Sequence, residues 1–156
     1  MTAASIARTL AAVCILLAGC AATPESSKEA DAYAKRFEPQ KGAAVIYLYR
    51  DDRFGQQNQV TATIDGRVIG QVLPTTFFRM VEFPGQHVVA VSGPSNAGVT
   101  LQTQDGGIYF VVMQVTGDDA DNVQMRQVAP LQGERDIMGC CDRMENWRRG
   151  QQRLLW

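Results

Sequence analysis

The stretch QVTATIDGRVIGQVL, residues 59–73, consists of two runs rich in β-branched residues on either side of Asp65-Gly66. An Asp-Gly pair is the strongest short signal for a two-residue hairpin turn, because both turn residues must tolerate a positive φ. In the first run, apolar residues alternate with polar ones, as they do in a strand with one buried face: Val60, Ala62 and Ile64. The stretch therefore predicts a β-hairpin.

Six more segments have the same β-branched and aromatic character and are bounded by turn residues: 43–50, 75–83, 87–93, 98–103, 108–116 and 122–129. Short strands with turns about every 8 to 12 residues are typical of antiparallel sandwiches and barrels. We therefore predict that residues 41–130 form an all-β domain, an antiparallel β-sandwich. Because the strands begin near Lys41, we also expect the chain from Lys41 onward to fold without the residues that precede it.

A short helix is predicted before this domain. Ser26 and Glu29 have the spacing of a capping box, and apolar residues then recur at helical intervals. We expect the helix to cover about residues 27–37. Its aromatic residues, Tyr33 and Phe37, are expected to pack on the sandwich.

The tail, residues 131–156, is predicted to contain a second helix. Five residues form an apolar stripe at helical spacing: Ile137, Cys140, Cys141, Met144 and Trp147. Charged residues lie largely off this stripe, and Gly150 is expected to end the helix. The residues from Trp147 to Trp156 make an aromatic and basic end. We consider two roles for it, packing on the sandwich or contact with an anionic surface or a partner.

Residues 1–19 have the features of a secretory signal peptide. Arg8 is the charged side chain of this segment, and the apolar stretch that follows is too short to cross a bilayer as a helix. The next feature, Leu-Ala-Gly-Cys at residues 17–20, resembles the bacterial lipobox. That resemblance implies cleavage before Cys20, a diacylglyceryl group on its thiol and an acylated amine, and it removes Cys14. The alternative is an ordinary signal peptide.

On this interpretation, residues 20–40 form a lipid-anchored tether and the short helix. Several acyl chains give stable membrane attachment, where a single chain would be marginal. The lipobox resemblance also favours a particular membrane, because lipoproteins retained in the inner membrane usually carry aspartate after the cysteine, and this chain has Ala21. We therefore expect a protein of the bacterial cell envelope, anchored in the outer membrane and facing the periplasm.

The domain also matches the pattern of a known family in an ordered set of residues: Lys41, Gly42, Tyr47, Tyr49, Arg50, Asp65, Gly66, Pro84, Gly85, His87, Gly106 and Tyr109. Over about residues 37–129 the chain resembles bacterial envelope lipoproteins that carry domain of unknown function 2846. The resemblance implies a prealbumin-like or immunoglobulin-like β-sandwich, and it brings no activity with it. The tail and its adjacent cysteines are not part of this pattern.

Composition excludes several functional classes. Lys and Arg number 15 against 16 for Asp and Glu, so the chain has no basic field of the kind that binds nucleic acid. Hydrophobic residues make up 46% of the chain, which indicates a folded domain rather than a disordered one. The single histidine, His87, limits both general acid–base chemistry and metal binding.

Candidate catalytic and binding groups are few. His87 has Ser92 and Ser95 nearby in the sequence, but no nucleophile motif surrounds these serines. A hydrogen-bonding residue at a strand edge is therefore the simpler interpretation of His87. Residues 117–122, GDDADN, lack the glycine and the distal glutamate of a calcium loop, and we interpret them as a solvated turn. Residues 50–53, Arg-Asp-Asp-Arg, are interpreted as a surface ion-pair cluster.

Cys140 and Cys141 are the unusual feature of the tail, because an oxidising compartment does not leave thiols idle. We keep three alternatives. They are free thiols on the apolar face of the helix, a disulfide, or a site for a soft ion such as Cu(I) that also uses Met138 and Met144. Adjacent residues of a helix point about 100° apart, so a bond between these two cysteines would require distorting the helix.

Together these observations predict a lipid-anchored, non-enzymatic envelope protein whose β-sandwich acts as a binding or structural module. Its expected partners are the membrane, through Cys20, and another envelope protein or a cell-wall component. We expect no cofactor and no nucleic acid. Two alternatives from other classes stay open: an envelope enzyme that uses His87 with a carboxylate, and a soft-metal or redox-sensing lipoprotein that uses Cys140 and Cys141.

Overall fold

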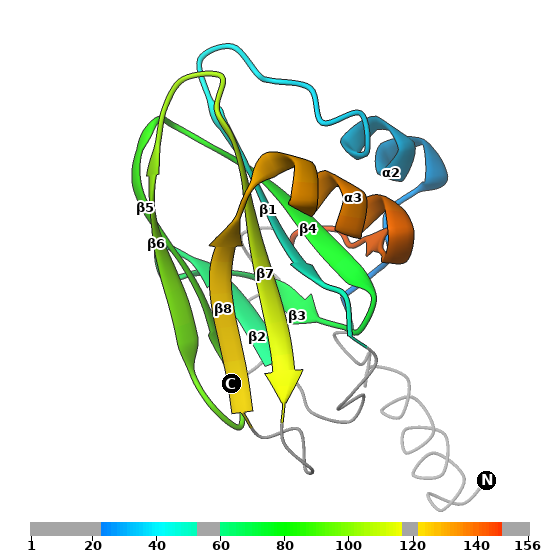
Figure 1. Cartoon of the computed structure of the whole chain (residues 1–156), viewed down its shortest axis with the longest axis vertical. Helices are drawn as coiled ribbons and strands as arrows, with labels where there is room; N and C mark the ends of the chain where they lie inside the picture. Colours follow the sequence, from blue (N-terminus) through cyan, green and yellow to red (C-terminus); the bar gives the residue numbers. More distant parts are fainter. Residues whose placement is uncertain (1–22, 53–59, 117–121, 148–156) are drawn as a thin grey trace, which may run out of the picture.

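The computed structural model describes residues 23–52, 60–116 and 122–147. Two β-sheets pack against each other, and two short helices lie on one of them (Figure 1). The strands of the first sheet lie in the order β8 (Asn122–Val128), β7 (Ile108–Thr116), β1 (Ala44–Arg50), β4 (Thr76–Glu82) and β9 (Asp142–Arg143). Those of the second lie in the order β3 (Arg67–Val72), β2 (Val60–Ile64), β5 (Gly85–Ser92) and β6 (Ala97–Thr103). The helices are α2 (Lys28–Ala34) and α3 (Pro130–Cys140).

The sandwich-like arrangement is confirmed, and each predicted strand is present with its ends within two residues of those expected. The prediction of an antiparallel sandwich is wrong for the first sheet, which is mixed. In it β1 pairs in parallel with β7, from Val45 opposite Ile108 to Arg50 opposite Met113, and β4 pairs in parallel with β9. Between β1 and β7 the chain forms two pairs of strands in the second sheet, β2–β3 and β5–β6. The parallel pairing of β1 with β7 therefore joins segments far apart in the sequence, and no local sequence pattern predicts it.

The predicted hairpin at Asp65-Gly66 is confirmed. Both turn residues have positive φ, 50° and 76°, and they connect β2 to β3. Farther along β3, Gly70 has a φ of 150°. A Cβ at this position would lie 2.8 Å from the ring of Phe78 in the other sheet, so glycine allows the two sheets to approach closely here.

The main hydrophobic core lies between the two sheets. It is formed by alternate residues of the strands together with Met144 from the tail. β1 is buried along its whole length, because its other face is covered as well. That second face contributes Val45, Tyr47 and Tyr49 to a smaller cluster under the helices, with Phe77 and Phe110 from the neighbouring strands.

The helix α2 is shorter than predicted and is capped by a different serine. Ser27, not Ser26, accepts a hydrogen bond from the backbone N–H of Ala30. Phe37, just beyond the helix, packs its ring on Tyr47 and Phe110, with centroids 5.3 and 5.7 Å away. The expectation for Phe37 is therefore confirmed. Tyr33 is half exposed and lies 4.5 Å from the guanidinium of Arg36.

The segment before α2 is packed rather than free, which corrects the prediction of a tether for residues 23–27. Thr23 is buried, and its hydroxyl accepts a hydrogen bond from the backbone N–H of Gln71 at 2.7 Å. Glu25 forms a β-bridge with Met144, and the N–H of Ser26 donates to the carbonyl of Arg143 at 2.8 Å. Residues 1–22, which include Cys20, lie outside the described residues.

The second predicted helix ends earlier than expected. α3 begins with Pro130, a residue suited to the first helical position, and ends at Cys140, where Cys141 becomes extended. The chain then pairs with β4, because the N–H groups of Asp142 and Met144 donate hydrogen bonds to the carbonyls of Thr75 and Phe77. The apolar stripe is nonetheless buried at four of its five positions: Ile137, Cys141, Met144 and Trp147. Gly150 and the residues after Trp147 lie outside the described part.

Candidate functional site

Several turns of the described chain come together at one end of the sandwich, which we call the turn end: residues 40–43, 65–66, 83–87 and 104–107. The N–H of Gly42 donates to Asp105 at 2.6 Å, and that of Gly106 to the carbonyl of Ala43 at 2.8 Å. The N–H of Gly85 donates to the hydroxyl of Thr103 at 3.1 Å. In Figure 1 the loops 36–43 and 104–107 lie together at the top. Residues scattered along the sequence therefore build one surface.

His87 lies at this end and is held at both ring nitrogens. Its Nδ1 is 2.7 Å from the carboxylate of Asp65, and its Nε2 is 2.7 Å from the carbonyl oxygen of Phe83. Both of these oxygens can only accept, so the two contacts are both hydrogen bonds when each nitrogen carries a proton. Asp65 also accepts the N–H of Val88 at 2.8 Å. The predicted hydrogen-bonding role of His87 fits this geometry, but its strand β5 lies between β2 and β6 and is not at the edge of the sheet.

These contacts shift the pKa of each partner. Partial burial opposes the charged imidazolium, but the hydrogen bonds to Asp65 and Phe83 and the charges of Asp65 and Glu82 outweigh it and raise the pKa of His87. Burial likewise opposes the Asp65 carboxylate, but hydrogen bonds from His87 and Val88 and nearby positive charges lower its pKa. The pair is therefore charged over a wider pH range than either group alone.

The structure does not bring His87 to the serines that the sequence placed near it. Ser92 is at the opposite end of β5, and the hydroxyl of Ser95 accepts the N–H of Val123 at 2.7 Å. A catalytic histidine needs one nitrogen directed at the nucleophile, and the Nε2 of His87 is directed at a backbone carbonyl.

Replacing His87 with Gln should lower stability in a pH-dependent way. A histidine with a raised folded-state pKa stabilises the fold below its unfolded pKa, about 6.5, and the contribution is lost as pH rises through the folded value. An aspartate with a lowered folded-state pKa stabilises the fold above its unfolded pKa, about 3.9, and this stabilisation is lost as the pH falls through the folded value. The difference in melting temperature between wild type and His87→Gln should thus be greatest near pH 5 to 6 and shrink by pH 9.

This effect should be small, about 1 kcal/mol or less, because the pair is partly exposed and screened by solvent. The measurement is a series of thermal melts followed by circular dichroism from pH 4 to 9. Asp65→Asn keeps a residue that tolerates the positive φ of the turn and should abolish the same pH dependence. A melting difference that stays constant across the pH range would show that the ion pair is not its cause.

A pocket of about 290 Å³ opens at the turn end. Residues 40–43 line one side of it and residues 81–83 the other. Phe83 is 84% exposed, which is unusual for a phenylalanine, and Val81 is 38% exposed. The carboxylate of Glu82 is paired with Arg67. This pocket combines exposed apolar side chains with a few polar groups, the composition typical of binding sites.

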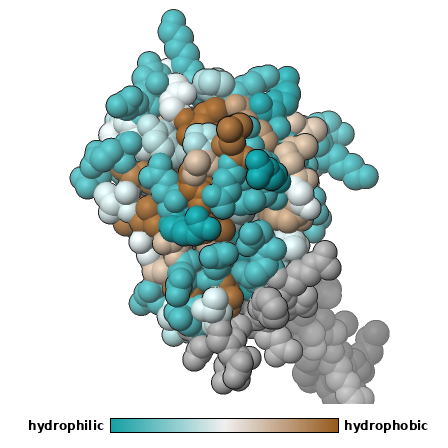
Figure 2. Space-filling model, in the orientation of Figure 1, coloured by the Kyte–Doolittle hydropathy of each residue, from teal (hydrophilic) through white to brown (hydrophobic). Residues whose placement is uncertain are grey.

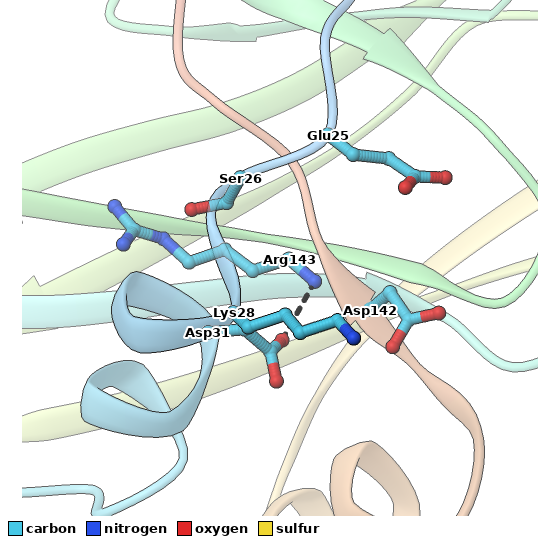
Figure 3. A pocket seen from close by; sticks show the side chains of 6 residues that line it. All are labelled: Glu25, Ser26, Lys28, Asp31, Asp142 and Arg143. Atoms are coloured by element: carbon cyan, nitrogen blue, oxygen red, sulfur yellow. Dashed lines mark hydrogen bonds between the residues drawn. The ribbon is translucent and has the colours of Figure 1, made fainter.

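A second pocket, of about 210 Å³, lies where the N-terminal segment meets β9 (Figure 3). Its lining carries both signs of charge: Glu25, Ser26, Lys28, Asp31, Asp142 and Arg143. Asp31 accepts the backbone N–H of Arg143 at 2.9 Å and forms an ion pair with Lys35 at 2.8 Å. These contacts fasten α2 to β9, so we assign this pocket a structural role.

The structure joins Cys140 and Cys141 in a disulfide at the point where α3 ends. Cys141 is buried, and its sulfur lies 3.5 Å from the carbonyl oxygen of Arg50. The methionines expected to share a soft ion with these cysteines lie apart from each other. Met138 is 61% exposed, and Met144 belongs to the core between the sheets rather than to the cluster that contains Cys141. No metal-binding group of His, Cys, Asp or Glu occurs within residues 23–52, 60–116 and 122–147.

The prediction that residues 50–53 form a surface ion-pair cluster is wrong for the first of them, Arg50. Arg50 is fully buried, and its Nε and Nη2 donate to one oxygen of Asp52 at 2.9 and 2.8 Å. The other oxygen of Asp52 accepts the N–H of Val115 at 3.1 Å. Arg53 and the loop at residues 117–121 lie outside the described residues. Arg50 thus anchors the end of β1.

The neighbouring Tyr49 shows how α3 is attached. Its hydroxyl donates to Asp136 of the helix at 2.6 Å. Burial, together with this hydrogen bond, raises the pKa of Tyr49. The side chain therefore stays neutral and serves as a hydrogen-bond donor rather than as a catalytic base.

Neither helix in the described part of the chain has the length and hydropathy of a membrane-spanning segment. No family model matches the chain. An uncharacterized protein of Haemophilus influenzae is 30% identical to it over 128 residues, which make up 80% of this chain and 76% of the relative. The chain therefore belongs to the same family as this Haemophilus influenzae protein.

Proposed function

We propose that the chain is a lipid-anchored, non-enzymatic protein of the bacterial envelope whose sandwich acts as a binding module. The observation that carries this proposal is the pocket at the turn end, beside which Phe83 is 84% exposed. Leaving a large aromatic side chain in water forgoes about 1.5–3 kcal/mol of burial free energy. A side chain placed in this way is better explained by a partner that covers it.

The engagement of His87 supports a binding role over catalysis. It is the single histidine of the chain, and both of its ring nitrogens contact acceptors within the fold. Acid–base catalysis at this residue would first require breaking one of these contacts. The alternative of an envelope enzyme using His87 with a carboxylate is therefore less favoured.

The anchor at Cys20 rests on the resemblance of residues 17–20 to a lipobox, and the course of the chain indicates which end of the sandwich such an anchor would hold. Two residues, Ala21 and Ala22, separate Cys20 from Thr23, so the distance between these two residues is at most about 11 Å. Thr23 bonds to Gln71, at the end of β3 opposite the Asp65-Gly66 turn. A lipid on Cys20 would hold this opposite end near the bilayer and leave the turn end directed into the periplasm.

Mass spectrometry of the mature N-terminus tests the anchor. The N-terminal peptide should begin at Cys20 and carry a diacylglyceryl group and an amide-linked acyl chain. Cys14→Ala should leave this modification unchanged, since Cys14 is removed with the signal peptide, whereas Cys20→Ala should abolish it. An unmodified mature N-terminus at another residue would refute the lipid anchor.

We also propose that the chain is a member of the family of domain of unknown function 2846, with the prealbumin-like or immunoglobulin-like β-sandwich that this resemblance implies. This membership is supported by the way in which the turn residues of that pattern gather at one end of the sandwich. The partner we expect there is another envelope protein, with a cell-wall component as the alternative.

A second candidate function is thiol–disulfide chemistry at Cys140 and Cys141, which is favoured by the disulfide itself. We rank it lower because Cys141 is buried and the bond lies where α3 changes into β9, a position that has a structural use. The soft-metal version of this alternative is disfavoured by the separation of Met144 from the cluster that holds Cys141.

A further inference from the structure

We propose that residues 148–156 bind the surface of an anionic phospholipid bilayer beside the lipid anchor, as a second membrane contact of the protein. The inference deepens the proposed function, and it rests on the proposed anchor at Cys20 for placing a bilayer near this part of the chain. It assigns a ligand, an anionic lipid surface, to the aromatic and basic end of the tail. The contacts that carry it are those of the described segment that leads into residues 148–156.

The two terminal segments of the described chain pair with each other. Glu25 forms an antiparallel bridge with Met144. This bridge lies between two backbone hydrogen bonds of 2.8 and 2.9 Å, from Ser26 to Arg143 and from Glu145 to Pro24. In an antiparallel pair, the chain followed from Glu25 back toward the N-terminus runs in the same direction as the chain followed forward from Met144. Both segments therefore leave the described fold side by side.

Both segments also end on the same edge of β3. The N–H of Gln71 donates to the hydroxyl of Thr23 at 2.7 Å. The N–H of Trp147 donates to the carbonyl of Ile69 at 2.8 Å. Ile69 and Gln71 are two residues apart, so these backbone groups face the same edge of the strand, and their Cα atoms lie at most about 7 Å apart. Thr23 and Trp147 are thus held at neighbouring places where the two segments leave the described residues.

A lipid on Cys20 would bring this edge of β3 close to the bilayer. Cys20 lies at most about 11 Å from Thr23, and Arg148 directly follows Trp147. The nine residues 148–156 span about 30 Å when fully extended, which exceeds the distance from Thr23 to the lipidated residue. The segment therefore starts beside the bilayer and is long enough to lie along it.

The composition of residues 148–156 suits an anionic lipid surface. The segment contains three arginines and no acidic residue, and it also contains Leu154, Leu155 and Trp156. Basic side chains near a bilayer are attracted to anionic headgroups, and tryptophan and leucine favour the boundary between headgroups and acyl chains. Attachment at Cys20 would confine the segment to this surface, which raises its effective concentration there.

The described surface beside this exit does not supply the attraction itself. The pocket of about 210 Å³ where the terminal segments meet (Figure 3) is lined by charges of both signs: Glu25, Asp31 and Asp142 against Lys28 and Arg143. These charges nearly balance, with a small acidic excess. A preference for anionic lipid should therefore come from the arginines of residues 148–156.

The alternative is that the tail folds back on its own chain. In Figure 2 the visible face is mostly hydrophilic, and its hydrophobic groups gather near α3, where Leu131 is 75% exposed and Met138 61%. However, α3 packs on the outer face of the first sheet (Figure 1), whereas Trp147 bonds to β3 of the second sheet. The tail therefore leaves the described fold away from this apolar surface.

The first experiment measures contact between Trp156 and the bilayer in the lipidated protein. The full-length chain is produced with its signal peptide, purified with its lipid and placed in vesicles of brominated phosphatidylcholine, with or without phosphatidylglycerol. Bromine quenches the fluorescence of nearby tryptophan, and the chain has two tryptophans. The difference between the wild type and Trp156→Phe therefore reports Trp156 alone. We expect strong quenching of Trp156 with phosphatidylglycerol, and much less without it or at high salt, because salt screens the attraction.

Matched charge variants identify the groups responsible. Replacing all three tail arginines should remove most of this quenching: Arg148→Gln, Arg149→Gln and Arg153→Gln. The control makes the same change of charge at exposed positions elsewhere and should leave the quenching unchanged: Lys41→Gln, Arg126→Gln and Arg135→Gln. A thermal melt of each variant checks that the fold is retained.

A lipid-free chain separates this proposal from the anchor. Residues 20–156 with Cys20→Ala keep every described contact, and they should pellet with vesicles that contain phosphatidylglycerol more than with phosphatidylcholine vesicles. Replacing the three tail arginines should weaken this binding roughly tenfold or more, because each basic residue adds to the attraction. Mass spectrometry of the mature N-terminus reports on the lipid at Cys20 alone, so the anchor and the tail can fail separately.

Three results would overturn the proposal. One is a lipid-free chain that pellets equally with both kinds of vesicle, or equally after the three arginines are replaced. Another is quenching of Trp156 that is the same with and without phosphatidylglycerol. The third is slow hydrogen exchange of residues 148–156 in the lipid-free chain without vesicles, which would assign the segment to its own fold.

Discussion

A chain that begins at Lys41 should lose its cooperative thermal transition. The outer face of β1 is one of the most apolar surfaces of the fold, and residues 23–40 cover part of it. Ala34 is fully buried there, and its carbonyl accepts the hydroxyl of Tyr47 at 2.7 Å. Phe37 packs its ring on Tyr47 and Phe110. Truncation would expose these rings and leave the Tyr47 hydroxyl without its partner.

The size of the loss follows from the area that is uncovered. Full burial of one large apolar side chain contributes about 1.5–3 kcal/mol, and several lose their cover together. The same truncation removes the bridge between Glu25 and Met144 and the bond from Ser26 to Arg143, which hold β9 in place. The sum is comparable with the whole stability of a small domain, about 5–15 kcal/mol.

Circular dichroism during heating measures this effect, and a chain that begins at Thr23 is the matched control, because it keeps every described contact. The control should melt cooperatively near the temperature of the full-length chain. A cooperative melt of the shorter chain within a few degrees of the control would show that the sandwich is independent of these residues. The contacts thus argue against the expectation, drawn from the sequence, that folding needs only the chain from Lys41 onward.

The difference between these expectations shows what local pattern can and cannot reveal. Strand positions were predictable because β-branched runs and turn residues act over a few neighbours, as at Asp65-Gly66. The parallel pairing of β1 with β7 was not, because it depends on the order in which distant strands enter the sheet. In the tail, the local sequence pattern and the tertiary contacts favour different structures. The apolar residues have helical spacing through Trp147, but the chain is extended after Cys140 because its N–H groups bond to the carbonyls of β4.

Some features of the candidate site could likewise be predicted from the sequence, and others could not. The residues that carry the sequence resemblance include His87, Asp65 and the turn glycines, and the structure brings them to one end of the sandwich. The pairing of His87 with Asp65 needed the register between β2 and β5, which no spacing in the sequence specifies. Phe83 could not be recognised as exposed, because it follows a strand whose residues Phe77 and Phe78 are fully buried.

Two glycines of α3 should respond in opposite directions to the same substitution. Gly139 is exposed, and a Cβ there would meet nothing within 4 Å. Gly139→Ala should therefore raise stability by about 0.5–1 kcal/mol, since alanine loses less backbone freedom than glycine in a helix. The result would also confirm that this turn of α3 lies free of the sheet.

Gly133 faces the sheet instead, and a Cβ there would lie 2.3 Å from the Cγ of Phe110. Phe110 cannot move aside easily, because its ring stacks on Tyr47 with centroids 5.0 Å apart and is fully buried. Gly133→Ala should therefore force α3 away from the sheet. Overpacking of this kind costs about 1–3 kcal/mol and sometimes more, which exceeds the gain in helix propensity.

Urea unfolding of both variants measures the contrast, with the midpoint rising for Gly139→Ala and falling for Gly133→Ala. Displacement of α3 should also loosen the bond between Tyr49 and Asp136, so hydrogen exchange in α3 should increase in Gly133→Ala alone. If both midpoints rose, the helix would have to lie farther from β7 than this packing allows. The opposite signs thus test the attachment of α3 directly, because the two variants share the same chemical change and differ only in what the new methyl group meets.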